Sequence, residues 1–202
     1  MRRELIVLGL AIGVAVGFFV SCTSLPELND RVRAYVEEFN AHDLEGVASR
    51  FTKDPTFEMG GLYTLKGKQA LKDLLAYDMV LDARLSVGNM RAAGDTVFAH
   101  LTVTNRWLEV ADIGEAHCQA MFVFHDGAID KFVGTLTPET RAAFDDVMGP
   151  MLAWAKQNAP DRLEEMTQDG RFIYNADNAE RALALLEDWK RSTEDDADSV
   201  PR

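Results

Sequence analysis

The sequence predicts an α+β domain in which helices come first, an antiparallel sheet follows, and further helices complete the chain. Three observations predict this class. Apolar residues recur at intervals of three and four between residues 26 and 80, alternate with polar residues between residues 83 and 136, and return to helical spacing after Pro138. Helices that precede a sheet meander, rather than alternate with its strands, are typical of the α+β class.

Three helices are expected before the first long strand. The first covers residues 26–40, where the apolar residues share one face: Leu28, Val32, Tyr35, Val36 and Phe39. Asp43 is the expected N-cap of a second helix over residues 44–51, because its carboxylate can accept hydrogen bonds from the first free amides. A third helix is expected over residues 67–80, with Leu71, Leu74 and Leu75 on its buried face.

The strands follow an alternating pattern. A short strand is expected over residues 56–59. A longer strand follows the turn at Gly94-Asp95, and its inward residues are Val97, Ala99, Leu101 and Val103. Two further strands cover residues 115–125 and 128–136, and Asp126-Gly127 joins them as a tight hairpin.

A C-terminal helical extension is expected over residues 137–191. One helix with a broad apolar face ends before Pro160, and a second covers residues 177–189. Residues 171–175 between them fit a short strand or a hinge. So much apolar surface must be buried against the domain or against a partner.

The N-terminus resembles a bacterial lipoprotein signal. Two arginines precede an apolar run over residues 5–20, and a small residue directly precedes Cys22. We therefore expect residues 1–21 to form a signal peptide and Cys22 to carry a lipid. Residues 22–27 would form a short tether that holds the domain at a membrane of the cell envelope.

Two alternatives to lipidation stay open. Phe19 stands where lipoprotein signals usually have leucine, which leaves an ordinary cleaved signal and a secreted or periplasmic protein as one alternative. The other is an uncut N-terminal anchor, because residues 5–22 reach the lower limit for spanning a bilayer. If Cys22 is acylated, Cys118 has no partner and is expected to be a small core residue. A disulfide between these two cysteines is the remaining possibility.

The composition excludes nucleic acid as a partner. The chain has a formal net charge of −12, and loss of Arg2, Arg3 and Glu4 with the signal would leave −12 − 1 = −13. Such an acidic surface repels nucleic acid. Residues 192–202 read as an acidic disordered tail. The expected partners are a small apolar molecule or an envelope protein, together with the membrane and a second copy of the chain.

No cofactor or metal is expected. The sequence contains no glycine-rich phosphate loop, Walker motif or serine nucleophile elbow. The histidines do not have the spacing that places two metal ligands on one face, and they are His42, His100, His117 and His125.

The order of these parts resembles the nuclear transport factor 2-like superfamily, which includes SnoaL-like proteins and ketosteroid isomerases. The resemblance covers residues 28–136. Its carriers are Tyr35 to Gly46, Phe51 to Pro55, Gly67, Gly94 to Val97, and Phe122 to Ile129. It implies a cone-shaped, curved antiparallel sheet wrapped around the three N-terminal helices, an apolar pocket, and often a dimer through the convex face. The C-terminal extension could then cover the mouth of the cone, pack on its convex face, or form a partner interface.

The resemblance to ketosteroid isomerases does not extend to their catalytic groups. Those enzymes use a carboxylate base together with a tyrosine and a protonated aspartic acid as oxyanion donors. Tyr35 falls at the position of the tyrosine, but the base position falls on Met59 and the second donor position falls on Ala120. Steroid isomerisation is therefore not expected. Tyr35 is expected to be a packed aromatic residue whose hydroxyl is satisfied locally.

Asp78 is the best remaining candidate for a catalytic residue, with Tyr35 beside it. On a continuous third helix it would extend the leucine face inward, where burial raises the pKa of a carboxyl group. We expect instead that the helix frays by Tyr77 and that Asp78 reaches solvent. Asn105, Trp107 and Glu109 continue the inward parity of the long strand, and suit either ligand contact or the pocket rim. The expected ligand-binding residues are Tyr35, Phe57, Met59, Leu101, Val103, Asn105, Trp107, Ala120 and Phe122.

Two functions are consistent with the sequence. The expected one is a lipid-anchored, non-catalytic pocket domain that binds a small apolar ligand or an envelope partner. The alternative is a cyclase- or isomerase-type enzyme that uses Asp78 with Tyr35 or Asn105. A buried Asp78 near either group would favour the enzyme, and an exposed Asp78 would contradict it.

The lipidation of Cys22 is tested by intact mass spectrometry of the full chain, expressed in a bacterium and extracted in detergent. We expect a mass that corresponds to cleavage before Cys22 plus a diacylglyceryl group, and loss of that mass in Cys22→Ser. A chain that starts elsewhere, or an uncut chain, would contradict lipidation.

Overall fold

A computed structural model of the chain describes residues 25–198. The expected signal peptide and the lipidation site at Cys22 lie outside these residues. In chain order the elements are α1 (Leu25–Asn40), α2 (Leu44–Ser49), β1 (Phe51–Met59), β2 (Tyr63–Lys66), α3 (Lys68–Val80), β3 (Arg84–Ala93), β4 (Thr96–Thr104), α4 (Arg106–Val110), β5 (Ala116–His125), β6 (Ala128–Leu136), α5 (Pro138–Asn158), α6 (Pro160–Glu165), β7 (Thr167–Gln168), β8 (Arg171–Phe172) and α7 (Ala176–Asp198).

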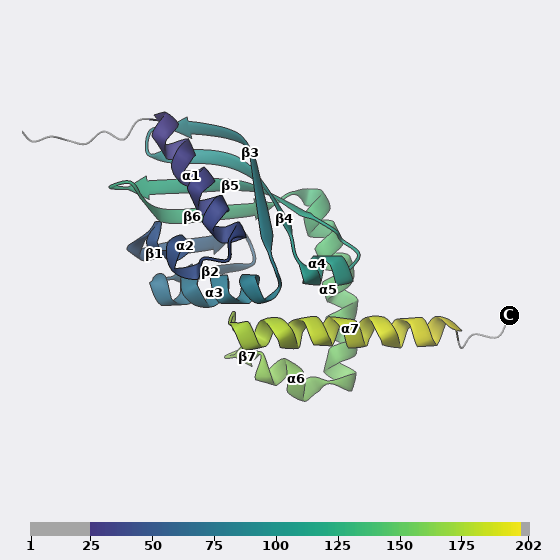
Figure 1. The fold of residues 1–202 in the computed structure, drawn as a ribbon. Helices are drawn as coiled ribbons and strands as arrows, with labels where there is room; N and C mark the ends of the chain where they lie inside the picture. The colour runs from purple at the N-terminus through teal and green to yellow at the C-terminus, as the bar shows by residue number, and fades with distance from the viewer. Residues whose placement is uncertain (1–24, 199–202) are drawn as a thin grey trace, which may run out of the picture.

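The main sheet has six strands in the order β2-β1-β6-β5-β4-β3. Only the β1–β6 pair is parallel, and the other neighbouring strands are antiparallel. The sheet curves, and α1 crosses it diagonally (Figure 1). Helices α2 and α3 lie near the C-terminal end of α1. Asp126 and Gly127 both adopt a positive φ at the β5–β6 turn, as a tight two-residue hairpin requires. The predicted α+β class is confirmed.

Helix α1 supplies much of the main core. Its predicted apolar face is buried against the sheet, with Val32 fully inaccessible and Tyr35 only 3% exposed. At its C-terminal end, the side chain of Asn40 makes two hydrogen bonds with the backbone of Leu85. The Asn40 amide donates to the Leu85 carbonyl over 2.8 Å, and the Leu85 N–H donates to the Asn40 oxygen over 2.7 Å. These bonds tie α1 to the outer side of the edge strand β3.

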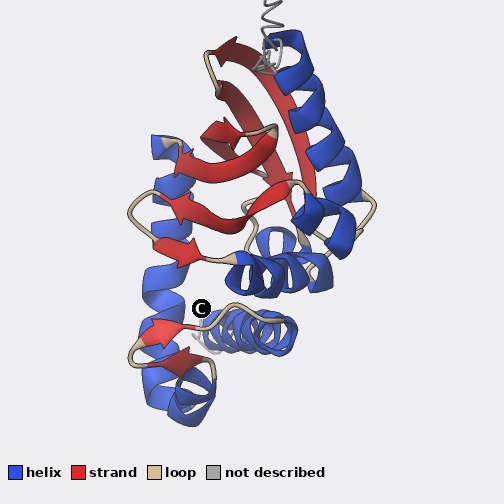
Figure 2. Cartoon of the chain, turned by 90° about the vertical axis from the view of Figure 1, so that its left-hand side faces the viewer, coloured by secondary structure: helices blue, strands red, loops and turns tan. Residues whose placement is uncertain are grey.

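The C-terminal extension forms a second layer next to the sheet. Helix α7 packs against α3, α4 and α5, and Figure 2 shows it end-on, separated from the sheet by α3. Its apolar residues join α4 and α5 in a second core cluster that includes Trp107, Met151, Leu183 and Leu186. The apolar surface of the extension is therefore buried within the chain.

Several predicted boundaries were wrong. The second helix ends at Ser49 and β1 already begins at Phe51, because an irregularity before Thr56 lets the strand accommodate Pro55. Strand β4 ends at Thr104 instead of continuing to Glu109, because Asn105 caps the short helix α4.

The C-terminal end also differs from the prediction. Helix α7 continues to Asp198, well into the segment that was expected to be a disordered tail. Ser192 and Thr193 donate hydroxyl hydrogen bonds to backbone carbonyls three residues earlier, which is compatible with helix. Strands β2, β7 and β8 and helix α6 are further elements, of which the sequence suggested only a strand or hinge around β8. Among residues 25–198, no helix is both long enough and apolar enough to cross a bilayer.

Substitution Asn40→Ala should lower the free energy of unfolding by about 1–3 kcal/mol, because it leaves both backbone groups of Leu85 without their partner. Urea unfolding of the full chain measures the change. Asn158 is the control, since its exposed side chain bonds only to the carbonyl of Trp154 on the same helix. Asn158→Ala should change stability by less than about 0.5 kcal/mol, and equal losses in both variants would contradict the role of Asn40.

Candidate functional site

A cavity of about 650 Å³ lies between the sheet, α3 and the C-terminal extension. The sheet and α1 contribute one wall, while α4, α5 and the segment from α6 to α7 close the other side. Most of the lining is apolar, as in small-molecule sites. The extension thus completes a space that the sheet leaves open.

Asp78 lines this cavity from the last turn of α3. The prediction that α3 frays by Tyr77 was wrong. The helix continues to Val80, so Asp78 stays on the face that turns inward. Part of its surface remains accessible, and we attribute that surface to the cavity wall. Among residues 25–198, no donor forms a hydrogen bond with its carboxylate.

Burial raises the pKa of Asp78 from its ordinary 3.8 to about 7, because the charged carboxylate loses hydration. Burial accounts for the shift without a neighbouring charge. Both protonation states of Asp78 are therefore populated near neutral pH, which is the property a general acid or base needs.

All four tyrosines of the chain line the same cavity, and they are Tyr35, Tyr63, Tyr77 and Tyr174. They come from α1, β2, α3 and the segment before α7. The ring of Tyr174 contacts two of the others, with centroids 4.6 Å from Tyr63 and 5.3 Å from Tyr77. Tyr35 packs apart from these three, against Phe39, Phe51 and Phe122.

The tyrosine hydroxyls have no hydrogen-bond partner within the described part of the chain. The local partner that was expected for Tyr35 is thus absent there. Burial raises the pKa of each tyrosine above its ordinary value, and the negative charge of Asp78 is the next largest cause in every case. The charge of Asp78 therefore acts on all four phenols. They stay protonated at neutral pH and can donate hydrogen bonds to a ligand.

Seven of the nine residues predicted to bind a ligand line the cavity: Tyr35, Phe57, Met59, Leu101, Val103, Asn105 and Trp107. The other two, Ala120 and Phe122, lie in the packed core instead. The side-chain oxygen of Asn105 accepts the amide hydrogen of Leu108 over 2.7 Å, so that atom is committed to capping α4. Glu109 is exposed and does not line the cavity, because the chain is helical there.

The sequence did not identify the cavity residues of the extension. They include Arg141, Phe144, Asp145, Phe172 and Tyr174. Tyr63 and Tyr77 were also missed. The only signal that could have identified Tyr77 was the helical periodicity that identified Asp78, because the two residues are adjacent on α3.

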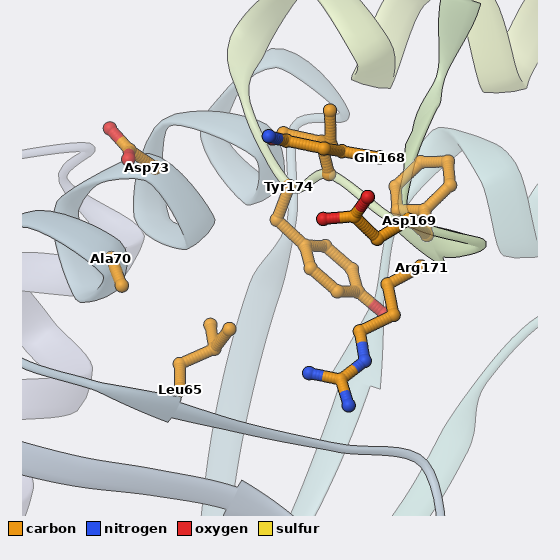
Figure 3. A pocket seen from close by; sticks show the side chains of 9 residues that line it. Leu65, Ala70, Asp73, Gln168, Asp169, Arg171 and Tyr174 are labelled. Atoms are coloured by element: carbon orange, nitrogen blue, oxygen red, sulfur yellow. The ribbon is translucent and has the colours of Figure 1, made fainter. Parts of the chain in front are cut away.

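An open groove of about 680 Å³ lies outside the cavity, between α3 and the β7–β8 segment. Figure 3 shows Ala70 and Asp73 of α3 on one side, Leu65 of β2 below, and Tyr174 with Arg171 toward the other side. Phe172 and Tyr174 line both the groove and the cavity. This segment is therefore the wall between the two spaces.

Within residues 25–198, no group of three or more histidine, cysteine, aspartate or glutamate side chains could hold a metal ion. His100 and His117 lie on neighbouring strands with ring nitrogens 3.4 Å apart, and neither lines the cavity. Cys118 is buried in the cavity wall with no disulfide to a described residue, and burial raises the pKa of its thiol to about 11. It is therefore not an activated nucleophile.

Comparison with solved structures places the fold. An LEH-like epoxide hydrolase from M. tuberculosis is 16% identical, with a TM-score of 0.51 over 66% of this chain and 98% of that one. SalBIII, an epoxide hydrolase/cyclase-like enzyme of pyran ring formation in the polyether salinomycin, is also 16% identical, with a TM-score of 0.51 over 57% of this chain and 94% of its own.

An NTF2-like protein of unknown function from Cytophaga hutchinsonii is 12% identical, with a TM-score of 0.47 over 57% of this chain and 94% of its own. At these identities the likeness extends to the fold alone. No curated protein matches the sequence. Residues 32–132, which are half of the chain and span α1 to β6, match the SnoaL-like domain family. The chain therefore belongs to the SnoaL-like family.

Proposed function

We propose that this protein is an enzyme that moves a proton on a small, largely apolar carbonyl compound, in a reaction of the isomerase or cyclase type. The observation that carries the proposal is the position of Asp78, a carboxyl group without a hydrogen-bond partner in the described chain, in an apolar cavity lined by four tyrosines. A carboxylate in this setting is a base, and protonated phenols are the donors that an enolate oxygen needs.

The proposed reaction begins when the Asp78 carboxylate accepts a proton from the carbon next to a substrate carbonyl. The C–H electron pair forms the enolate, and the negative charge that develops on oxygen is stabilised by a tyrosine hydroxyl. Tyr35 is the most deeply buried of the four tyrosines and is the first candidate for this donor. If the substrate is β,γ-unsaturated, the dienolate then takes the proton back from Asp78 at its γ carbon. Otherwise the enolate carbon attacks a second carbonyl carbon of the same molecule, whose π electron pair moves to oxygen, and that oxygen takes the proton from Asp78.

The electrostatics of the cavity suit both steps. Because burial raises the pKa of Asp78 to about 7, the group can accept a proton and return it at neutral pH. The tyrosines cannot take over as bases, since burial raises their pKa values further above neutrality.

Binding without chemistry is the second candidate function, and the predominance of apolar side chains in the lining supports it. It assigns no role to the charge of Asp78, whose burial would then only destabilise the fold. The two candidates therefore differ in the effect of replacing Asp78 by a neutral isostere.

We further propose that the domain acts outside the cytoplasm, held at the cell envelope by a lipid on Cys22. The support is the N-terminal sequence, with its paired arginines, apolar run and small residue before the cysteine. Mass spectrometry of the Cys22→Ser variant, described above, tests this proposal independently of the reaction.

Exchange of the α-protons of 2-tetralone in D2O, followed by NMR, tests the proposed base. The full chain in detergent should accelerate exchange, with a rate that rises with pH through about 7 and then levels, because only the deprotonated Asp78 accepts a proton. Asp78→Asn should lower the rate of exchange that the protein catalyses by at least about 100-fold.

Asp73→Asn is the matched control for this experiment. Asp73 lies on the same helix, but it faces the outer groove and accepts a hydrogen bond from Gln69. The control should exchange 2-tetralone at the rate of the unmodified protein. Equal rates for Asp78→Asn and the unmodified protein would contradict the enzyme and favour binding without chemistry.

The stability of the protein should also depend on Asp78. Its pKa is about 7 in the folded state and near 3.8 when unfolded, so between these values the folded state binds more protons. The contribution of Asp78 to the free energy of unfolding is therefore highest below pH 4 and falls by up to about 4 kcal/mol as the pH rises through 7.

Asp78→Asn removes this titration, so its stability relative to the unmodified protein should increase between pH 5 and pH 8. Urea unfolding at the two pH values measures the difference. Asp73→Asn should show no such increase. A constant difference between Asp78→Asn and the unmodified protein would mean that the carboxyl is hydrated in the folded state.

A further inference from the structure

Arg141 is the only basic side chain among the described residues that line the cavity. It lies in the first turn of α5 and is half-buried. One guanidinium nitrogen, Nη2, donates a hydrogen bond to the carbonyl of Gly60 over 2.9 Å. The other N–H groups have no partner within the described part of the chain.

The lack of a counter-ion distinguishes Arg141 from most arginines of this acidic chain. Those within 4.0 Å of a carboxylate are Arg31, Arg33, Arg50, Arg84, Arg162, Arg181 and Arg191. Arg91 lies over the ring of Phe98. Arg106 and Arg171 have no such partner among the described residues, but both are exposed to water. Of the arginines between residues 25 and 198, Arg141 alone is partly buried, lies in the cavity wall and has no anionic partner.

The protein holds Arg141 in place. Thr137 caps α5 by accepting the amide hydrogen of Thr140, which fixes the turn that carries Arg141. The bond to Gly60 joins that turn to the β1–β2 connection, between the cavity residues Met59 and Leu62. A guanidinium fixed through one N–H, with the others free, suits a ligand that accepts two parallel hydrogen bonds.

We propose that Arg141 binds the carboxylate of the ligand, and that the substrate is therefore an apolar carbonyl compound that also carries a carboxylate group. This inference rests on the proposed function for the site that it occupies. A cation that is partly removed from water without a partner is unfavourable, and an anionic ligand removes that penalty. Arg141 lies outside residues 32–132, so this specificity comes from the extension and not from the SnoaL-like domain.

Two acidic groups also face the cavity, Asp78 and Asp145. Asp145 lies one turn after Arg141 on α5 but is exposed, and its carboxylate is more than 4.0 Å from the guanidinium, since the two form no ion pair. It should repel an anion weakly. A ligand carboxylate at Arg141 would leave the apolar remainder of the molecule to occupy the cavity toward Asp78.

Equilibrium dialysis with two matched probes, 2-naphthylacetate and the neutral 2-naphthylacetamide, tests the proposal. The full chain is used at pH 8, with detergent at equal concentration on both sides of the membrane so that partitioning cancels. The unmodified protein should bind the acetate at least 10-fold more tightly than the acetamide. Arg141→Met should weaken the binding of the acetate by about 10- to 100-fold and the binding of the acetamide by less than 2-fold.

Three further variants make the result specific. Arg141→Lys should retain only part of the preference for the acetate, because the charge remains but the two parallel hydrogen bonds of the guanidinium are lost. Asp145→Asn should bind the acetate as tightly as the unmodified protein or more tightly. Asp78→Asn should retain the preference for the acetate. This should hold whether or not the unmodified protein catalyses proton exchange on 2-tetralone, so the binding result separates this inference from the proposed reaction.

The proposal is overturned if the unmodified protein does not prefer the acetate, or if Arg141→Met leaves that preference unchanged. Equal losses of acetate and acetamide in Arg141→Met would also overturn it, because they would show that Arg141 only supports the cavity wall through Gly60.

Discussion

The concave face of the curved sheet must be covered by apolar side chains, and most features of this protein follow from the way that cover is supplied. Helix α1 packs directly on part of the face through residues such as Val32 and Phe39. The C-terminal extension covers the remainder from a distance through α5 and α7, together with the short helix α4. A cavity persists because the extension spans the opening of the sheet without filling it.

The same closure creates the chemical character of the site. Asp78 lies in the last turn of α3, and Phe172 of β8 and Leu185 of α7 line the same cavity. Burial opposes its charge, and the nearby phenols remain neutral donors. A buried carboxyl without a hydrogen-bond partner in the described chain lowers stability at neutral pH, and such a penalty is common where function requires a reactive group.

Membership of the SnoaL-like family explains the framework but not the full lining of the cavity. The family domain carries Asp78 and three of the tyrosines, whereas Arg141, Phe144 and Tyr174 come from the segment that follows it. A common fold can therefore carry a site of its own, since function depends on particular side chains and not on the fold.

The sequence by itself determined the α+β class, the buried face of α1, the cap at Asp43 and the β5–β6 hairpin, because each depends on residues within a few positions of one another. It also identified four of the sheet residues that line the cavity, which are Phe57, Met59, Leu101 and Val103. Only the tertiary structure decided that Asp78 faces a cavity, and that the four tyrosines and Arg141 line it. Those outcomes depend on packing between α3 and segments about 60 to 100 residues later in the chain, which no local periodicity encodes.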